Sequence, residues 1–172
     1  MSQGEKIKLV MIDDEEALLV VVKANLEDTG EFEVVTSNDP KSAEALVQAE
    51  KPDVVLLDNV MPERSGADII QSIKKLGSEI GKTPIVMVSG KGEMVYNKKK
   101  DEFKWMPNNP VAREMAGHLP EAKSAEALAQ AYGIDDYVSK PFTTEVLVDV
   151  IKEVLSRKRK PKSDEGSSSS EE

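Results

Sequence analysis

The 172-residue chain is long enough to bury a hydrophobic core without covalent cross-links. It contains no cysteine, which excludes a disulfide framework, a thiolate metal site and a cysteine nucleophile. The formal net charge of -9 opposes general binding to nucleic acid, so proteins are the expected partners. The N-terminus lacks the layout of a signal peptide, and no apolar run reaches the roughly 20 residues that span a bilayer. We therefore expect a cytoplasmic protein without a membrane segment.

Short β-branched apolar segments alternate with helical ones, a pattern that is typical of an α/β domain with a parallel sheet. The expected strands are residues 7–12, 32–36, 53–57, 84–88 and 136–139. The expected helices are residues 15–27, 40–49, 67–76, 124–132 and 144–157. Asp39 and Pro40 fit an N-cap and a first helical position. Right-handed crossovers then predict a doubly wound, flavodoxin-like sheet with strand order 2-1-3-4-5.

Two segments do not follow this alternation. Residues 91–121 combine a lysine run, the only tryptophan, prolines and asparagines without a clear periodicity. We interpret them as an insertion between the strand at 84–88 and the helix at 124–132. Residues 158–172 are basic, then acidic and serine-rich, and cannot bury enough surface to offset their ordering entropy. We therefore expect one domain over residues 6–157, followed by a disordered tail.

Polar residues follow the expected strands at their carboxyl ends, where doubly wound sheets bind ligands. Asp13 and Asp14 follow the first strand, Asp58 the third, Ser89 the fourth and Lys140 the fifth. Three carboxylates at one edge repel one another unless a cation lies between them, and oxygen ligands favour Mg²⁺ or Mn²⁺. A carboxylate can also be a nucleophile that carries an acyl phosphate. The metal, the lysine and the serine hydroxyl would then neutralise the charge on the phosphoryl oxygens.

One continuous motif joins this set. The run from Asp58 to Gly66, DNVMPERSG, fits the pattern D-x-x-M-P-x-x-x-G. With the acidic pair, with the serine and glycine at 89 and 90, and with Lys140-Pro141-Phe142, it closely resembles the active-site set of response-regulator receiver domains. The resemblance covers about residues 6–157 apart from the insertion.

The resemblance assigns a role to each position of the set. It implies that Asp58 is phosphorylated and that Lys140 contacts the phosphoryl group. It further implies a Mg²⁺ site formed by Asp13, Asp14, Asp58 and the backbone carbonyl of Asn59.

A switch is implied as well. In receivers the hydroxyl residue, here Ser89, moves toward the phosphoryl oxygen, and the aromatic residue, here Tyr137, turns inward. The peptide bond between Lys140 and Pro141 is expected to be cis, a conformation accessible to proline. Simple packing at the sheet edge is the alternative for Tyr137, and capping of the first helix is an additional role expected for Asp14.

The expected function is that of a stand-alone response regulator. It is not an enzyme acting on other molecules, because it would catalyse only its own phosphorylation from a donor and its own dephosphorylation. The expected partners are a sensor histidine kinase or a histidine phosphotransfer protein and an unidentified downstream protein. Only a short tail follows the last helix, so we expect no DNA-binding output domain, and we expect a monomer or a weak dimer.

Two other functions fit parts of the sequence. One is a receiver-like binding module that works without phosphate, through the insertion at 91–121. In either function, the insertion is a lid or docking loop in which Phe103 and Trp105 anchor a partner, or it is a tolerated surface loop, which costs little loop-closure entropy. The other is an aspartyl-nucleophile hydrolase, which is disfavoured because Val60 stands where a second carboxylate is required. His118, the only histidine, is a poor candidate for a phosphodonor because glycine and proline flank it.

Overall fold

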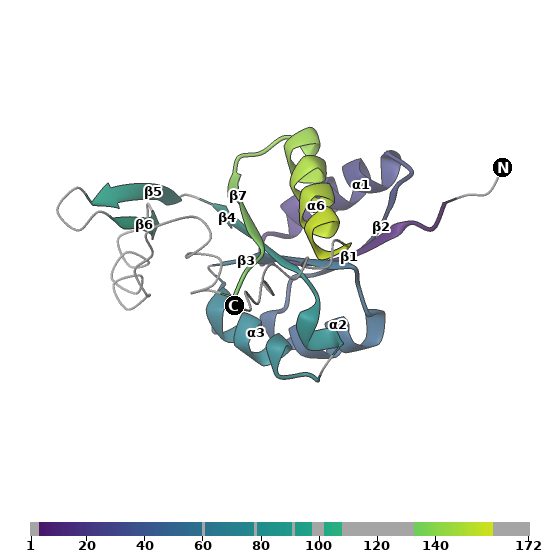
Figure 1. The fold of residues 1–172 in the computed structure, drawn as a ribbon, viewed down its shortest axis with the longest axis horizontal. Coiled ribbons are helices and arrows are strands. Elements are labelled where there is room, and N and C mark those ends of the chain that lie inside the picture. Colours follow the sequence, from purple (N-terminus) through teal and green to yellow (C-terminus); the bar gives the residue numbers. More distant parts are fainter. Residues whose placement is uncertain are drawn as a thin grey trace, which may run out of the picture.

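The computed structural model in Figure 1 describes residues 4–59, 61–77, 79–90, 92–97, 102–107 and 133–159. A five-stranded sheet forms its middle layer, with strands β1 (Ile7–Ile12), β2 (Phe32–Ser37), β3 (Val54–Asp58), β4 (Ile85–Gly90) and β7 (Asp136–Lys140). The order across the sheet is β2-β1-β3-β4-β7, and all four neighbouring pairs are parallel. Since these strands are the first to fifth of this sheet along the chain, the predicted order 2-1-3-4-5 is confirmed.

Helices cover both faces of this sheet. They are α1 (Glu16–Asp28), α2 (Ala43–Glu50), α3 (Gly66–Lys74) and α6 (Thr144–Arg159), with short 3-10 turns η1 (Pro40–Ser42) and η2 (Ile80–Lys82). In Figure 1, α1 and α6 lie on one side of the sheet and α2 and α3 on the other. The predicted helix at 124–132 lies outside the described residues.

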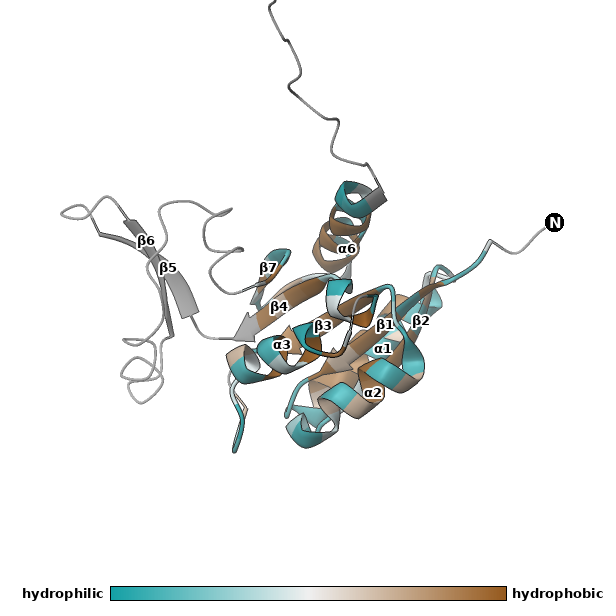
Figure 2. Ribbon diagram, turned by 60° about the horizontal axis from the view of Figure 1, so that its bottom comes forward, coloured by the Kyte–Doolittle hydropathy of each residue, from teal (hydrophilic) through white to brown (hydrophobic). Residues whose placement is uncertain are grey.

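Two hydrophobic clusters, one on each face, explain why the strands read as nearly continuous apolar runs. In β1, Leu9 and Met11 pack into the cluster on the side of α1 and α6. Val10 and Ile12 point the other way, into the cluster that includes residues of α2 and α3. All four are fully buried. Figure 2 shows the result, with hydrophobic strands inside and hydrophilic colour on the outer sides of the helices.

The segment around η1 illustrates how local sequence sets an element boundary. Asp39 is the N-cap, and its Oδ1 accepts a hydrogen bond from the backbone N–H of Lys41 at 2.9 Å. Pro40 follows at the first position of the turn, where its missing N–H costs nothing. This first turn is a 3-10 turn, however, and the α-helix begins only at Ala43.

Part of the insertion forms a regular element that we did not expect. Strands β5 (Gly92–Asn97) and β6 (Glu102–Pro107) pair antiparallel as a separate two-stranded sheet. In Figure 1 this β5–β6 hairpin extends away from the central sheet beyond β4. The interpretation of 91–121 as lacking a regular pattern is therefore wrong for these strands. The signal was the alternation of polar and apolar residues over Glu102, Phe103, Lys104 and Trp105.

The end of the described chain is helical. Helix α6 begins at Thr144, as predicted, and continues to Arg159, past the predicted end at residue 157. The remaining residues of the predicted tail lie outside the described part of the chain. None of the described helices combines the length and the apolar composition that crossing a membrane requires.

Candidate functional site

The carboxyl edge of the sheet brings together four charged residues that are far apart in the sequence. Asp13 and Asp14 follow β1 directly, Asp58 ends β3 and Lys140 ends β7. The parallel register aligns these ends, since Ile12 lies opposite Leu57 and Gly90 lies opposite Lys140. One carboxylate oxygen from each of the three aspartates lies within 4.8 Å of the other two. We call Asp13, Asp14 and Asp58 the acidic cluster.

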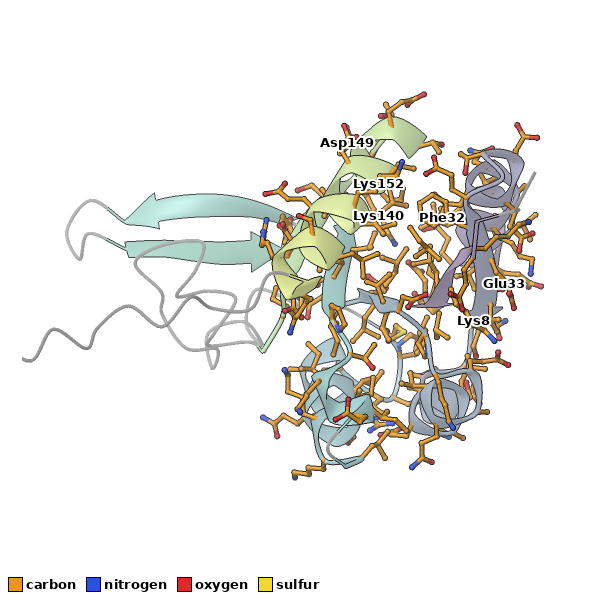
Figure 3. All side chains as sticks on the ribbon, turned by 45° about the vertical axis from the view of Figure 1, so that its right-hand side comes forward. Lys8, Phe32, Glu33, Lys140, Asp149 and Lys152 are labelled. Carbon is orange, nitrogen blue, oxygen red and sulfur yellow. The ribbon has the colours of Figure 1, made fainter. Side chains whose placement is uncertain are left out.

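Asp13 is the fully buried member of the acidic cluster. Its Oδ2 accepts a hydrogen bond from the Lys140 ammonium at 2.6 Å, and its Oδ1 accepts one from the backbone N–H of Glu15 at 2.9 Å. Burial raises the pKa of Asp13, and the hydrogen bond from Lys140 acts in the opposite direction. In Figure 3, Lys140 is labelled among the side chains beside α6.

Asp14 differs from its neighbour because its side chain is exposed. The expectation that Asp14 caps the first helix is wrong. The N-cap position of α1 is Glu15, and no side chain caps it. Asp14 is therefore free of a capping role at the edge of the acidic cluster.

Asp58 is 6% exposed, at the end of a fully buried strand. Its Oδ1 lies 3.9 Å from the Lys140 ammonium. The pKa of Asp58 is raised to about 7, chiefly by burial and also by the charge of Asp13, while the charge of Lys140 acts against both. One lysine therefore faces three carboxylates, and the site has an excess of negative charge that a cation would relieve.

The donors at this edge fit a hard divalent cation. They are oxygen atoms only, which is the ligand set that Mg²⁺ and Mn²⁺ prefer. The backbone carbonyl of Asn59 accepts a hydrogen bond from the N–H of Gly66 at 3.0 Å. A carbonyl oxygen has two lone pairs, so this bond leaves Asn59 a second acceptor position. The residues that would hold the ion are Asp13, Asp14, Asp58 and Asn59.

The predicted switch residues lie on β4, which neighbours β3, and on β7, which neighbours β4 at the edge of the sheet. Ser89 is in β4, opposite Ser139 of β7, but its side chain is outside what the structure describes. Tyr137 is half-buried against the core cluster on the side of α2 and α3. Its hydroxyl accepts a hydrogen bond from the Ser139 hydroxyl at 2.9 Å. The peptide bond between Lys140 and Pro141 is cis.

Other predicted residues are not brought to this edge by any described contact. Phe103 and Trp105 belong to β6, where they lie opposite Tyr96 and Met94, and their side chains are outside the described part of the structure. His118 also falls outside the described residues. Sequence reasoning missed Arg64, which ties the loop after Asp58 to α2. No local signal could have found it, because its partner Glu44 lies 20 positions earlier.

The doubly wound sheet with an acidic cluster and a lysine at its carboxyl edge defines the class of this protein. Residues 9–102 match the sequence profile of the response regulator receiver domain, and the chain belongs to this family. The matched segment ends within the β5–β6 hairpin, before β7 supplies Lys140. The family match therefore does not extend to Lys140, whose predicted place at the site is confirmed by its contacts with Asp13 and Asp58.

Known relatives agree with this family. The chain is 32% identical over 154 residues to the phosphate regulon transcriptional regulatory protein PhoB of Rhizobium meliloti, covering 90% of this chain and 54% of that protein. The chain thus spans about half of the length of that relative.

Solved structures share the fold. The chemotaxis response regulator CheY4 of Vibrio cholerae superposes with a TM-score of 0.60 at 23% identity, covering 87% of this chain and 99% of that one. A response regulator receiver domain protein from Clostridium thermocellum gives 0.61 at 25% identity, covering 89% and 97%. Receiver domains are phosphoacceptor signalling modules, and this chain contains one.

Proposed function

We propose that this chain accepts a phosphoryl group on Asp58 from the phosphohistidine of a sensor histidine kinase or a histidine phosphotransfer protein. The observation that supports it best is the position of Asp58, nearly buried at the end of β3 and beside Asp13 and Asp14. The Lys140 ammonium lies 3.9 Å from its carboxylate. An isolated structural aspartate needs none of these neighbours.

The proposed transfer is a substitution at phosphorus. A carboxylate oxygen of Asp58 attacks the phosphorus atom, the new O–P bond forms, and the N–P bond of the phosphohistidine breaks. The histidine nitrogen keeps the electron pair and takes up a proton. Hydrolysis ends the signal: water attacks the phosphorus, the O–P bond to Asp58 breaks, and the Asp58 carboxylate and inorganic phosphate are released.

The other residues of the site handle charge. Bound Mg²⁺ supplies positive charge to the phosphoryl oxygens and to the acidic cluster. The Lys140 ammonium neutralises a further phosphoryl oxygen. Asp13 holds that ammonium at 2.6 Å and so orients it toward Asp58. In the same proposal, Ser89 and Tyr137 form the switch that reports phosphorylation to the surface.

The test is to incubate the metal-free protein with Mg²⁺ and acetyl phosphate, and to measure the intact mass. We expect a phosphoryl adduct that depends on Mg²⁺ and is absent in Asp58→Asn. Asp53→Asn is the matched control, because Asp53 is an exposed aspartate that precedes the same strand. An adduct that persists in Asp58→Asn, or no adduct from acetyl phosphate or from phosphorylated donor protein, would refute the proposal.

A second proposal concerns the β5–β6 hairpin, which we assign to docking of the downstream protein. The supporting observation is continuity, because β5 begins at Gly92, directly after the strand that carries Ser89. A displacement at Ser89 would therefore be passed to the base of the hairpin. In a rival version of this role, the hairpin binds its partner without phosphorylation.

The fluorescence of Trp105, the only tryptophan of the chain, distinguishes docking that depends on phosphorylation from docking that does not. If the hairpin responds to the site, beryllofluoride with Mg²⁺ should change the emission of Trp105 in the native chain but not in Asp58→Asn. An unchanged emission in a protein whose adduct is confirmed by mass would favour the phosphorylation-independent version. Phe103→Ala and Trp105→Ala would then be compared for binding of the downstream protein.

A further inference from the structure

The loop between β3 and α3, residues 59–65, carries the carbonyl that the metal site requires. We propose that Arg64 is a positioning residue: by clamping this loop to α2, it holds the Asn59 carbonyl in place and thereby increases the affinity for Mg²⁺. The inference rests on the proposed function of the acidic cluster. It gives a role to a residue that the D-x-x-M-P-x-x-x-G pattern does not specify, because Arg64 stands at one of its x positions.

Arg64 is the most extensively bonded side chain of the loop. Its Nη1 donates to Oε2 of Glu44 at 2.8 Å, and its Nη2 donates to Oε1 of the same carboxylate. Nη1 also donates to the carbonyl of Pro40 at 3.3 Å, and Nη2 donates to the Ser72 hydroxyl at 2.8 Å. The guanidinium thus joins η1, α2 and α3 to the loop. Among the described residues of the loop, no other side chain bonds to three elements.

The Arg64–Glu44 pair is stronger than an ordinary surface ion pair. The side chains are only 22% and 21% exposed, and Nη1 and Nη2 of Arg64 each donate to a different oxygen of the Glu44 carboxylate. Such bidentate, charge-assisted hydrogen bonds are about twice as strong as neutral ones. The hydrogen bond from Arg64 lowers the pKa of Glu44, so the carboxylate stays ionised at neutral pH. A pair of this kind can hold a loop whose backbone is otherwise strained.

Backbone hydrogen bonds within the loop connect the region of Arg64 to Asn59. The backbone N–H of Arg64 donates to the carbonyl of Pro62 at 2.8 Å, and Glu63 has a left-handed φ of 67°. A non-glycine residue with that φ persists only where surrounding contacts enforce it. Two residues after Arg64, the N–H of Gly66 donates to the Asn59 carbonyl at 3.0 Å. Arg64 therefore lies two residues from the hydrogen bond that the proposed metal ligand accepts.

Loss of the clamp should affect metal binding more than it affects the fold. A loop that is free to relax must be ordered again when the carbonyl binds the ion, and this ordering reduces affinity. Removing residues that support metal ligands typically reduces metal affinity by about 10-fold to 100-fold. We expect Arg64→Ala to weaken Mg²⁺ binding by about tenfold.

The experiment uses the full chain, freed of metal, and titrates it with MgCl₂ in a calorimeter at constant ionic strength. A second readout, exchange of the Gly66 amide in the metal-free protein, follows the loop without any metal. We expect Arg64→Ala to raise the Mg²⁺ dissociation constant about tenfold and to speed exchange at Gly66. Arg64→Lys should retain part of the affinity, because a lysine cannot form the bidentate pair.

Lys41→Ala is the matched control. Lys41 pairs with Glu63 of the same loop at 2.8 Å, but these side chains are 68% and 65% exposed. An exposed pair contributes little, so this variant should bind Mg²⁺ within about twofold of the native chain. Glu44→Ala should reproduce the loss seen in Arg64→Ala, and the double variant should lose no more, because each single change already breaks the same pair.

Two outcomes would overturn the inference, and they are distinguishable from failure of the proposed function. If Arg64→Ala lowers the melting temperature but leaves the Mg²⁺ affinity and Gly66 exchange unchanged, Arg64 only stabilises the fold. If Arg64→Ala does not fold, the same comparison is made with Arg64→Lys and Glu44→Gln. If the native chain binds Mg²⁺ no better than Asp58→Asn does, the metal site itself is wrong and both proposals fail.

Discussion

Asp13 and Asp58 are buried charged side chains at the end of a hydrophobic sheet, and their environment explains their chemistry. Taking a carboxylate out of water is costly unless a partner compensates its charge. Lys140 provides one positive charge, which Asp13 binds at 2.6 Å and Asp58 faces at 3.9 Å. This compensation is incomplete, and the remaining negative charge fits the edge for a divalent cation.

The protonation of Asp58 gives a pH-dependent prediction. In the metal-free native state its pKa is raised to about 7, whereas an unfolded aspartate titrates near 4. At pH values between these two pKa values, the native state holds a proton on Asp58 that the unfolded state has lost. The free energy of unfolding therefore falls as the pH rises. The stability advantage of Asp58→Asn over the native chain should therefore grow by on the order of 2 kcal/mol from pH 5 to pH 8.

Urea unfolding in the presence of EDTA at both pH values measures this difference. Asp149→Asn on α6 is the control. Asp149 is exposed, as Figure 3 shows, and its substitution removes the same charge outside the acidic cluster. Its effect should not grow between pH 5 and pH 8. An equal effect of Asp58→Asn at the two pH values would contradict the origin that we give to the raised pKa.

Among the elements, α3 shows how closely the backbone of the loop is packed against the end of β3. Gly66 begins this helix, and a Cβ atom there would lie 2.7 Å from the backbone oxygen of Asp58. Backbone atoms cannot give way as a flexible side chain can, so Gly66→Ala should lower the free energy of unfolding by about 2 kcal/mol. Gly4→Ala, with nothing within 4 Å, should change it by less than about 0.5 kcal/mol.

Urea unfolding of the two glycine variants, measured with the metal-free protein, makes this comparison. If Gly66→Ala were as stable as Gly4→Ala, the turn would have room to open. The tight geometry on which the role of Arg64 depends would then be wrong.

Helix α1 presents an apolar stripe beside the site. Val20 and Val21 are 63% and 53% exposed, and Ala17 and Ala24 are exposed at the same helical spacing. Because α1 begins just after the acidic cluster, a protein that lies on this stripe could bring a phosphohistidine to Asp58. We expect the protein phosphodonor to be its occupant.

Val21→Asp tests this expectation. It should slow phosphotransfer from a phosphorylated histidine phosphotransfer protein about tenfold, which corresponds to about 1.4 kcal/mol. Phosphorylation by acetyl phosphate should be unchanged, because a small donor needs no docking surface. Ala49→Asp, on the exposed side of α2, should leave both reactions unchanged. Equal slowing with both donors would mean that the variant damages the site.

At the level of the whole molecule, the receiver fold is built from strands that all lie outside the insertion. The first four strands of the central sheet lie before the insertion, with β4 ending at Gly90, and the fifth, β7, begins after it at Asp136. Replacing residues 91–121 with a short Gly-Ser linker should therefore preserve the sheet, with a change in the free energy of unfolding of about 1 kcal/mol or less, because loop-closure entropy changes slowly with length. Circular dichroism and urea unfolding would measure this.

The same deletion variant separates the two interpretations of the insertion. If it takes up phosphate and loses it at the native rate, but no longer binds the downstream protein, the hairpin is a docking element. If its binding is also unchanged, residues 91–121 are a tolerated surface extension. Loss of the cooperative unfolding transition would instead show that the insertion is part of the folded core.

The fold and the acidic cluster could be predicted from the sequence, because both follow from local rules. Buried parallel strands need continuous apolar segments such as residues 7–12, and their carboxyl ends meet at one edge whatever the details. Strand order and the grouping of Asp13, Asp14, Asp58 and Lys140 could therefore be predicted. The alternation in β6 was also readable, although the hairpin was overlooked.

The side-chain contacts between elements could not be predicted in the same way. Nothing near Arg64 in the sequence indicates that it would bind Glu44, and nothing near Asp13 indicates that it, rather than Asp58, would hold Lys140 at 2.6 Å. Such pairings depend on how two helices and a loop happen to approach one another in space. Periodicity and motif spacing specify which face a residue occupies, whereas the partner it meets is specified by the packing of the whole chain.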